Sequence, residues 1–189
     1  MTGHTGTSTG TSTGGPTVLV ACVGNIFKSD DGFGVQVAAR LAQQELPEQV
    51  RVIDFGIRSV HLVYELLSGY DVLVLVDTVA HQEGPPGSLY LIEPDIGADI
   101  DAAPRDDGGL PEVMLDAHDL SPGAVMELLP TLGGQVRRIL VVGVQPQTLE
   151  DGIGLSEAVQ AAVGPAAAMV VDVVRRELVP RADPRFAER

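Results

Sequence analysis

The apolar run Val72–Val76 constrains the fold more than any other stretch of the chain. Five consecutive Val and Leu residues predict a strand with both faces covered, because a strand with one face in water alternates apolar and polar side chains. Such strands are typical of parallel sheets that carry helices on both sides. The run ends at Asp77, so we expect a central strand that delivers a carboxylate to its carboxyl end.

Further strands are predicted over 18–23, 50–54 and 138–144, from apolar runs rich in Val and Ile. The segment 88–92 alternates, with Leu89 and Leu91 on one face, and predicts a more exposed and antiparallel edge strand.

Helical spacing predicts helices that begin near Gly34, Ser59, Ser121 and Ser156, each serine standing at a helix start. We expect Gly164-Pro165 to kink or interrupt the last helix. Strands that alternate with helices indicate an α/β fold. The expected architecture has three layers, with a mostly parallel twisted sheet of about five strands between helices.

The length of 189 residues predicts one α/β domain over 17–179. Residues 1–16 are rich in Thr, Gly and Ser, have no apolar core of a secretory signal, and predict a flexible tail. Residues 180–189 are expected to form a second tail. The acidic stretch 93–119 predicts a solvated loop.

A formal net charge of −14 argues against nucleic acid and anionic membranes as partners. No apolar run is expected to reach membrane-spanning length. The single cysteine, Cys22, excludes an internal disulfide and is interpreted as a small core residue. We therefore expect a cytoplasmic protein, and a monomer.

Two adjacent carboxylates, Asp30 and Asp31, follow the first predicted strand. One aspartate there is explained as a helix N-cap, but only one of the two can be the cap. Gly32 and Gly34 would let another chain or an ion approach closely. The loop alone does not decide whether Asp30 and Asp31 cap a helix or belong to a functional site. A dinucleotide fingerprint fits poorly, because Val37 stands where its third glycine belongs.

The strands also place Asp54 and Asp77 at the edge where Asp31 lies. Parallel strands bring their carboxyl ends together, so these carboxylates are expected to converge. Their mutual repulsion would be relieved by a cation.

A zinc, nickel or iron site would also need a nitrogen ligand. His4 lies in the tail and His61 begins a helix, whereas His81 and His118 both lie in loops, and spacing does not choose between them. Outside the Thr/Gly/Ser tail the chain has no Gly-x-Ser-x-Gly elbow, and it has no His-Glu-x-x-His motif. A hydrolase built on this chain would use carboxylates or a metal-bound water.

The sequence resembles the hydrogenase maturation endopeptidases from about Val18 to Val174. The residues that carry the resemblance are, in order, Gly24-Asn25, Asp30-Asp31-Gly32, Gly34-Val35, Asp54, Gly56, Val76-Asp77-Thr78-Val79, Pro86-Gly87-Ser88-Leu89, His118-Asp119-Leu120, Gly143-Val144-Gln145-Pro146 and Gly154-Leu155-Ser156. The set together is specific, whereas no single piece is.

The resemblance implies a protease that removes a short C-terminal peptide from the precursor of a nickel–iron hydrogenase large subunit. It implies that Asp31, Asp77 and His118 are the metal ligands and catalytic residues, which selects His118 over His81. It also implies that nickel, already bound in the precursor, is the recognition signal. The family is grouped with aspartic peptidases, and its fold is a twisted sheet between helices, of the phosphorylase/hydrolase-like type.

Phe55 departs from the family pattern, because many members have a second glycine after the residue that matches Asp54. Asp54 is interpreted either as a catalytic base or as a helix cap. Two other functions stay open. One is a non-catalytic module that binds a metal or an anion, and the other is a processing protease with another substrate, such as the spore germination endopeptidases.

Overall fold

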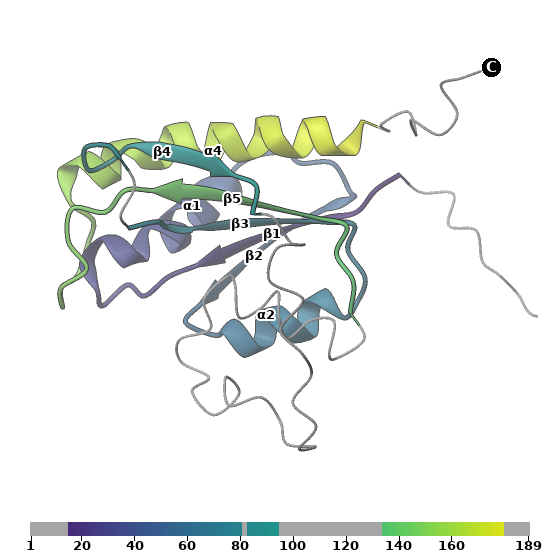
Figure 1. The fold of residues 1–189 in the computed structure, drawn as a ribbon, viewed down its shortest axis with the longest axis horizontal. Helices are drawn as coiled ribbons and strands as arrows, with labels where there is room; N and C mark the ends of the chain where they lie inside the picture. The colour runs from purple at the N-terminus through teal and green to yellow at the C-terminus, as the bar shows by residue number, and fades with distance from the viewer. Residues whose placement is uncertain (1–14, 81–82, 95–133, 180–189) are drawn as a thin grey trace, which may run out of the picture.

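The computed structural model describes residues 15–80, 83–94 and 134–179 (Figure 1). These residues contain a five-stranded sheet in the order β2-β1-β3-β5-β4. Four strands are parallel, and only the edge strand β4 runs antiparallel, to β5. The strands are β1 (Val18–Val23), β2 (Val50–Gly56), β3 (Val72–Thr78), β4 (Leu89–Ile92) and β5 (Arg138–Val144). The predicted strands are therefore confirmed, with β2 and β3 extending slightly further than expected.

The helices cover both faces of this sheet, which confirms the three-layer α/β architecture (Figure 1). Helices α1 (Phe33–Leu41) and α4 (Glu157–Leu178) pack on one face, and α2 (Ser59–Leu66) packs on the other. A short 3-10 helix, η1 (Ser29–Gly32), leads into α1. The helix expected near Ser121 lies outside the described residues.

Alternate residues of the central strands point to opposite faces of the sheet and belong to two separate hydrophobic cores. Val18, Val20 and Cys22 of β1 pack under α1 and α4, whereas Leu19 and Ala21 pack under α2. This is the arrangement that a continuous apolar strand predicts. Burial raises the pKa of the Cys22 thiol to about 12, with a smaller contribution from Asp54. Cys22 is thus a protonated core residue, as expected.

Helix α4 passes through Pro165 without a break, so the predicted interruption is wrong. Proline removes one backbone hydrogen bond and leaves the carbonyl of Ala161 without its usual donor. Ala161, Gly164 and Pro165 all lie on the exposed side of α4, where water can reach that carbonyl. The opposite side is buried against the sheet and α1, which holds the helix together.

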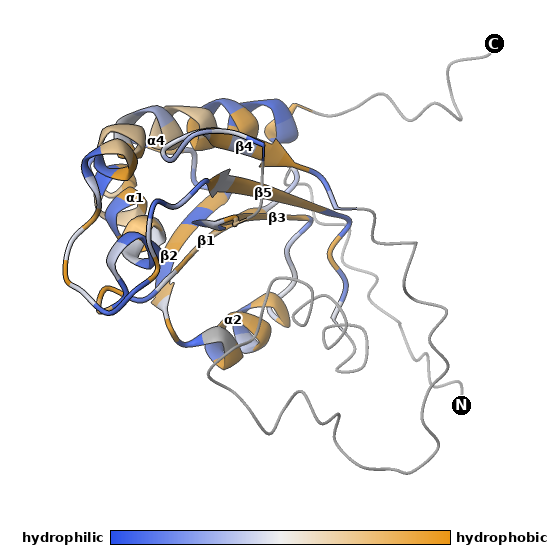
Figure 2. Cartoon of the chain, turned by 60° about the vertical axis from the view of Figure 1, so that its left-hand side comes forward, coloured by the Kyte–Doolittle hydropathy of each residue, from blue (hydrophilic) through white to orange (hydrophobic). Residues whose placement is uncertain are grey.

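The same helix is an exception to the expectation that no apolar run reaches membrane-spanning length. Within the described ranges, α4 is the one helix long and apolar enough to cross a membrane by length and composition. Half of its most apolar window is buried inside the protein. Orange apolar positions of α4 face the sheet in Figure 2, as in the core helix of a globular protein.

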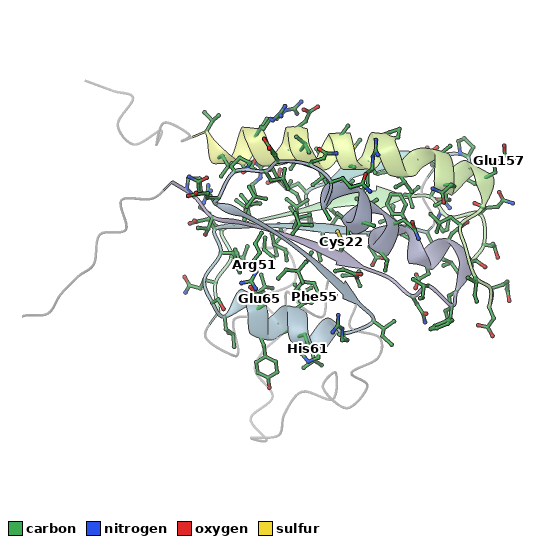
Figure 3. The ribbon with its side chains drawn as sticks, turned by 180° about the vertical axis from the view of Figure 1, so that it is seen from behind. Cys22, Arg51, Phe55, His61, Glu65 and Glu157 are labelled. Carbon is green, nitrogen blue, oxygen red and sulfur yellow. The ribbon has the colours of Figure 1, made fainter. Side chains whose placement is uncertain are left out.

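Ion pairs connect strands and helices at the amino ends of the parallel strands, which is the end of the sheet opposite to the loops that follow β1 and β3. Arg138, the first residue of β5, donates two hydrogen bonds of 2.6 Å to Glu93 and a third to Glu177 of α4. Arg51 of β2 and Glu65 of α2 point toward each other and pair at 2.9 Å (Figure 3). These contacts tie the outer strands to the helices.

Candidate active site

The candidate site lies at the carboxyl edge of the sheet, where the strand order reverses. From β1 the chain continues to β2 on one side, whereas β3 lies on the other side of β1. Ligands of open α/β sheets bind at such switch points. Asp31 in η1 follows β1, and Asp77 is the next-to-last residue of β3. The fold therefore brings these two predicted residues to the same place.

Asp31 is partly buried and joins the ends of the two strands. One carboxylate oxygen accepts a hydrogen bond from the Asn25 amide at 2.9 Å. The other accepts the hydroxyl of Thr78 at 3.3 Å, and Thr78 is the last residue of β3. The side chain is thus aimed across the switch point toward β3.

Asp77 lies beside Asp31 in a poorly hydrated setting. Its pKa is raised to about 7, mainly because burial disfavours the charged form and also because Asp31 is negative. Hydrogen bonds from Thr78 oppose this shift, including the backbone donor at 2.7 Å. A carboxyl with a pKa near neutrality, next to a second carboxylate, is typical of a functional site.

The carboxylate pair has no cationic partner within the described part of the chain, where the ion pairs involve other residues. The same residues contain no group of three His, Cys, Asp or Glu side chains that could hold a metal. The third predicted ligand, His118, lies outside the described residues, as do His4 and His81. His61 is described, and it lies exposed on α2 (Figure 3). Two adjacent oxygen ligands without a counter-ion fit a divalent cation.

Glycines allow the backbone to pack tightly around this pair. A Cβ atom on Gly34 would lie 2.0 Å from the Val23 carbonyl oxygen and 2.7 Å from that of Val76. A Cβ atom on Gly24, whose φ is +147°, would lie 1.9 Å from the Asp31 carbonyl oxygen. The group that approaches Gly34 closely is therefore the backbone of β1 and β3, which packs directly against the start of α1, and not an ion or another chain.

Asp30 has a different role from its neighbour. Its side chain is fully buried, and its carboxylate accepts hydrogen bonds from three backbone amides and one hydroxyl. The donors are Gln147 N at 2.8 Å, Thr148 N at 3.1 Å, Ser156 N at 2.6 Å and Ser156 Oγ at 3.0 Å. Burial alone would raise the pKa of Asp30, but these hydrogen bonds lower it overall. Asp30 therefore fastens the β5–α4 loop to the β1–α1 loop.

The capping interpretation of the two aspartates is wrong. The N-cap of α1 is Gly32, which makes no side-chain capping bond. At α4, Ser156 occupies the N-cap position, but its hydroxyl donates to Asp30 instead of capping the helix. Helix α2 begins at Ser59 itself, after Arg58 at the N-cap.

Asp54 is exposed near the end of β2 and accepts the Gly56 amide at 2.9 Å. It therefore holds its own turn. The N-cap of α2 is Arg58, whose side chain makes no capping bond, so Asp54 is not the cap of that helix. The Gly24 amide donates to the Gly56 carbonyl at 3.1 Å, which places this turn alongside the start of the β1–α1 loop. Phe55 is buried in the core under α2 (Figure 3).

Sequence reasoning assigned no role to Asn25 and Thr78, although both contact Asp31. The signal was available, because Thr78 stands directly after the predicted site residue Asp77, and Asn25 belongs to the Gly24-Asn25 motif that carries the family resemblance.

Comparisons with known proteins identify the family of this chain. A family model described as hydrogenase maturation protease matches residues 35–173. The chain belongs to the hydrogenase maturation protease family. Hydrogenase 2 maturation protease of Escherichia coli is 28% identical over 171 residues, which cover 87% of this chain and 96% of the relative. The HupM hydrogenase expression/formation protein of Azotobacter chroococcum is 32% identical over 158 residues, covering 82% and 70%.

Solved structures of such proteases share the fold. The hydrogenase maturating endopeptidase HybD from E. coli has a TM-score of 0.64 at 25% identity, covering 85% of this chain and 93% of its own. An E. coli endopeptidase solved in solution has a TM-score of 0.66 at 27% identity, covering 91% and 99%. These relatives favour the hydrogenase branch over the spore germination endopeptidases.

Proposed function

We propose that this maturation protease removes the C-terminal peptide from the precursor of a nickel–iron hydrogenase large subunit. Membership of the family supports a protease, and its relatives include a hydrogenase 2 maturation protease and a hydrogenase maturating endopeptidase. The observation that carries the proposal is the uncompensated pair Asp31 and Asp77 at the switch point of the sheet.

The precursor in this proposal arrives with nickel bound, and the nickel is part of the substrate. Asp31 and Asp77 would contact it, together with His118. Two carboxylates and an imidazole leave coordination positions for groups of the precursor, as a processing site requires. A protease that reads the metal in this way would act only on precursors that have been loaded.

The chemistry of the pair suits this recognition. Asp77, whose pKa is about 7, is partly protonated at neutral pH. A cation placed between the two carboxylates favours their ionised forms, so binding should release a proton. Asp31 is held in place by Asn25 and Thr78 and presents its carboxylate without rearrangement. Asp54 is proposed as a base of lower priority, in keeping with the aspartic-type grouping of the family.

The acidic surface and the buried lone cysteine support action in the cytoplasm on a protein, without nucleic acid or membrane as a partner. A non-catalytic metal-binding module on the same scaffold is the alternative, and cleavage separates the two.

Mass spectrometry of the precursor tests the proposal. The protease is mixed with a purified large-subunit precursor, once nickel-loaded and once nickel-free, and the products are weighed. Loss of a C-terminal peptide from the loaded form alone is the expected result. Cleavage of both forms would overturn the role of nickel, and cleavage of neither would favour the binding module.

A further inference from the structure

Two loops at the carboxyl edge of the sheet form one unit. They are the β1–α1 loop, residues 24–32, and the β5–α4 loop, residues 145–156 (Figure 1). The Ser29 amide donates to the Gly152 carbonyl at 3.0 Å, and the Gly152 amide donates to the Phe27 carbonyl at 2.9 Å. The Ser29 hydroxyl adds a bond of 3.0 Å to the Glu150 carbonyl. The buried Asp30 carboxylate fastens both loops from beneath.

This unit holds large apolar side chains in water. Phe27 is 64% exposed and Ile153 is 86% exposed, and Ile26 and Leu149 are exposed as well. We call these four residues the two-loop platform. Figure 2 shows apolar positions on both loops where they run side by side. The backbone bonds described above prevent the loops from folding these side chains away, and neighbouring exposed apolar groups indicate an interaction site.

The platform is continuous with the candidate site. The Asp31 amide donates to the Lys28 carbonyl at 3.0 Å, and the Lys28 amide donates to the Asn25 carbonyl at 3.0 Å. Ile26 and Phe27 therefore belong to the same tight turn as Asp31. A polypeptide that reaches Asp31 and Asp77 from this side must contact the platform.

A positively charged side chain, that of Lys28, adjoins the platform. Lys28 is the only lysine of a chain with a net charge of −14, and it follows Phe27 directly. Its side chain is exposed, and the ion pairs found among the described residues do not include it, although Glu150 and Asp151 lie on the facing loop. An unpaired ammonium beside apolar groups fits a partner that brings its own carboxylate.

We propose that the two-loop platform and Lys28 dock a segment of the precursor that carries apolar side chains and a carboxylate. This inference rests on the proposed function and names the surface through which the same site holds its protein substrate. Apolar contact supplies affinity, and Lys28 orients the segment so that the scissile bond lies near Asp31.

Processing kinetics with the nickel-loaded precursor test the platform. The double variant Phe27→Ser/Ile153→Ser should raise KM about tenfold or more, because both side chains lose apolar contact with the precursor. Its kcat should stay within about twofold, because these residues only bind the substrate. The matched control is Tyr64→Ser/Val179→Ser, which removes two other exposed apolar side chains, 61% and 63% exposed, from α2 and the end of α4. The control should retain the wild-type KM.

Lys28→Ala should raise KM about threefold to tenfold and weaken the dependence of KM on salt. An unchanged KM in Phe27→Ser/Ile153→Ser, with wild-type cleavage intact, would overturn the platform and leave the protease assignment standing. Loss of dimers in that variant, seen by sedimentation of wild type and variant, would reassign the surface to self-association. If the wild-type protein cleaves no precursor, the proposed function and this inference fail together.

Discussion

The two ends of the sheet differ in how their charged side chains are compensated. At the amino end, Arg138 is held between Glu93 and Glu177, and Glu177 is only 5% exposed. At the carboxyl end, Asp31 and Asp77 share a poorly hydrated site without a cation from any described residue. The first arrangement neutralises its charges within the chain and holds β4, β5 and α4 together. The second leaves negative charge uncompensated, as a site that receives a cation requires.

The pKa values show the same contrast. Hydrogen bonds to Glu93 and Glu177 raise the pKa of Arg138 further above its ordinary value, so its charge is permanent. At the other end, burial and a like charge raise the pKa of Asp77 to about 7, so its charge depends on its surroundings. Asp77 can therefore change its charge when a ligand binds, whereas Arg138 cannot.

The largest expected effect is at the carboxyl end. Asp31→Asn and Asp77→Asn should each reduce processing about a thousandfold or more, because each removes a charge needed at the reacting site. Both variants should melt within a few degrees of wild type, because neither side chain belongs to the apolar cores. Glu45→Gln, the same change at an exposed site, is the control. Unfolded variants would mean that the pair is structural.

A break at the amino end should cost stability instead. Arg138→Met leaves Glu177 buried without its guanidinium partner and should lower the free energy of unfolding by about 3–5 kcal/mol. Arg138→Met/Glu177→Gln should recover part of this loss. Urea unfolding measures both variants, and the folded fraction should still process the precursor. A loss of activity that exceeded the unfolded fraction would contradict the separation of the two ends.

Asp30 offers an internal check, because it adjoins Asp31 yet serves the fold. In the wild-type protein each carboxylate oxygen of Asp30 accepts at least one backbone N–H. In Asp30→Asn the side-chain NH2 group would therefore face a backbone N–H donor in either orientation of the amide. We expect a loss of about 2–3 kcal/mol in unfolding free energy. Ser156→Ala removes only the hydroxyl donor and should cost about 1 kcal/mol. Equal losses would show that the backbone donors contribute little.

The smallest effect concerns pH. Unfolded Asp77 releases its proton near pH 3.8, whereas folded Asp77 keeps it until about pH 7, so the folded state binds more protons in between. Stability of the metal-free protein should therefore fall as pH rises from about 4 to 7, by on the order of 1–2 kcal/mol once solvent screening is allowed for. Asp77→Asn should flatten this slope in urea titrations. A wild-type slope in that variant would assign the effect to another group.

The strands were predictable from the sequence because apolar runs such as Val72–Val76 have few other ways to be buried. The antiparallel edge was predictable too, since β4 shows alternation and not a continuous run. The convergence of Asp31 and Asp77 followed from parallel strands ending at one edge. These features depend on local pattern and on the geometry of a parallel sheet.

The remaining features depend on contacts between distant residues. The donors that bury Asp30 come from residues 147–156, so no local pattern distinguishes it from Asp31. Pro165 is tolerated because of which side of α4 faces water, and a single helical segment does not reveal that. The role of His118 stays a prediction, because that residue lies outside the described ranges.

The strand order also bears on how the molecule assembles. Strands β1, β2 and β3 follow one another between Val18 and Thr78, whereas β5 begins only at Arg138. Pairings between distant segments cost more loop-closure entropy and form more slowly. We therefore expect the first three strands to fold early, and β5 with α4 to dock late. The β5–α4 loop docks together with these two elements, so the hydrogen bonds to the Asp30 carboxylate form last. A partly folded chain would then contain Asp31 and Asp77 but not yet the two-loop platform that is proposed to bind the substrate.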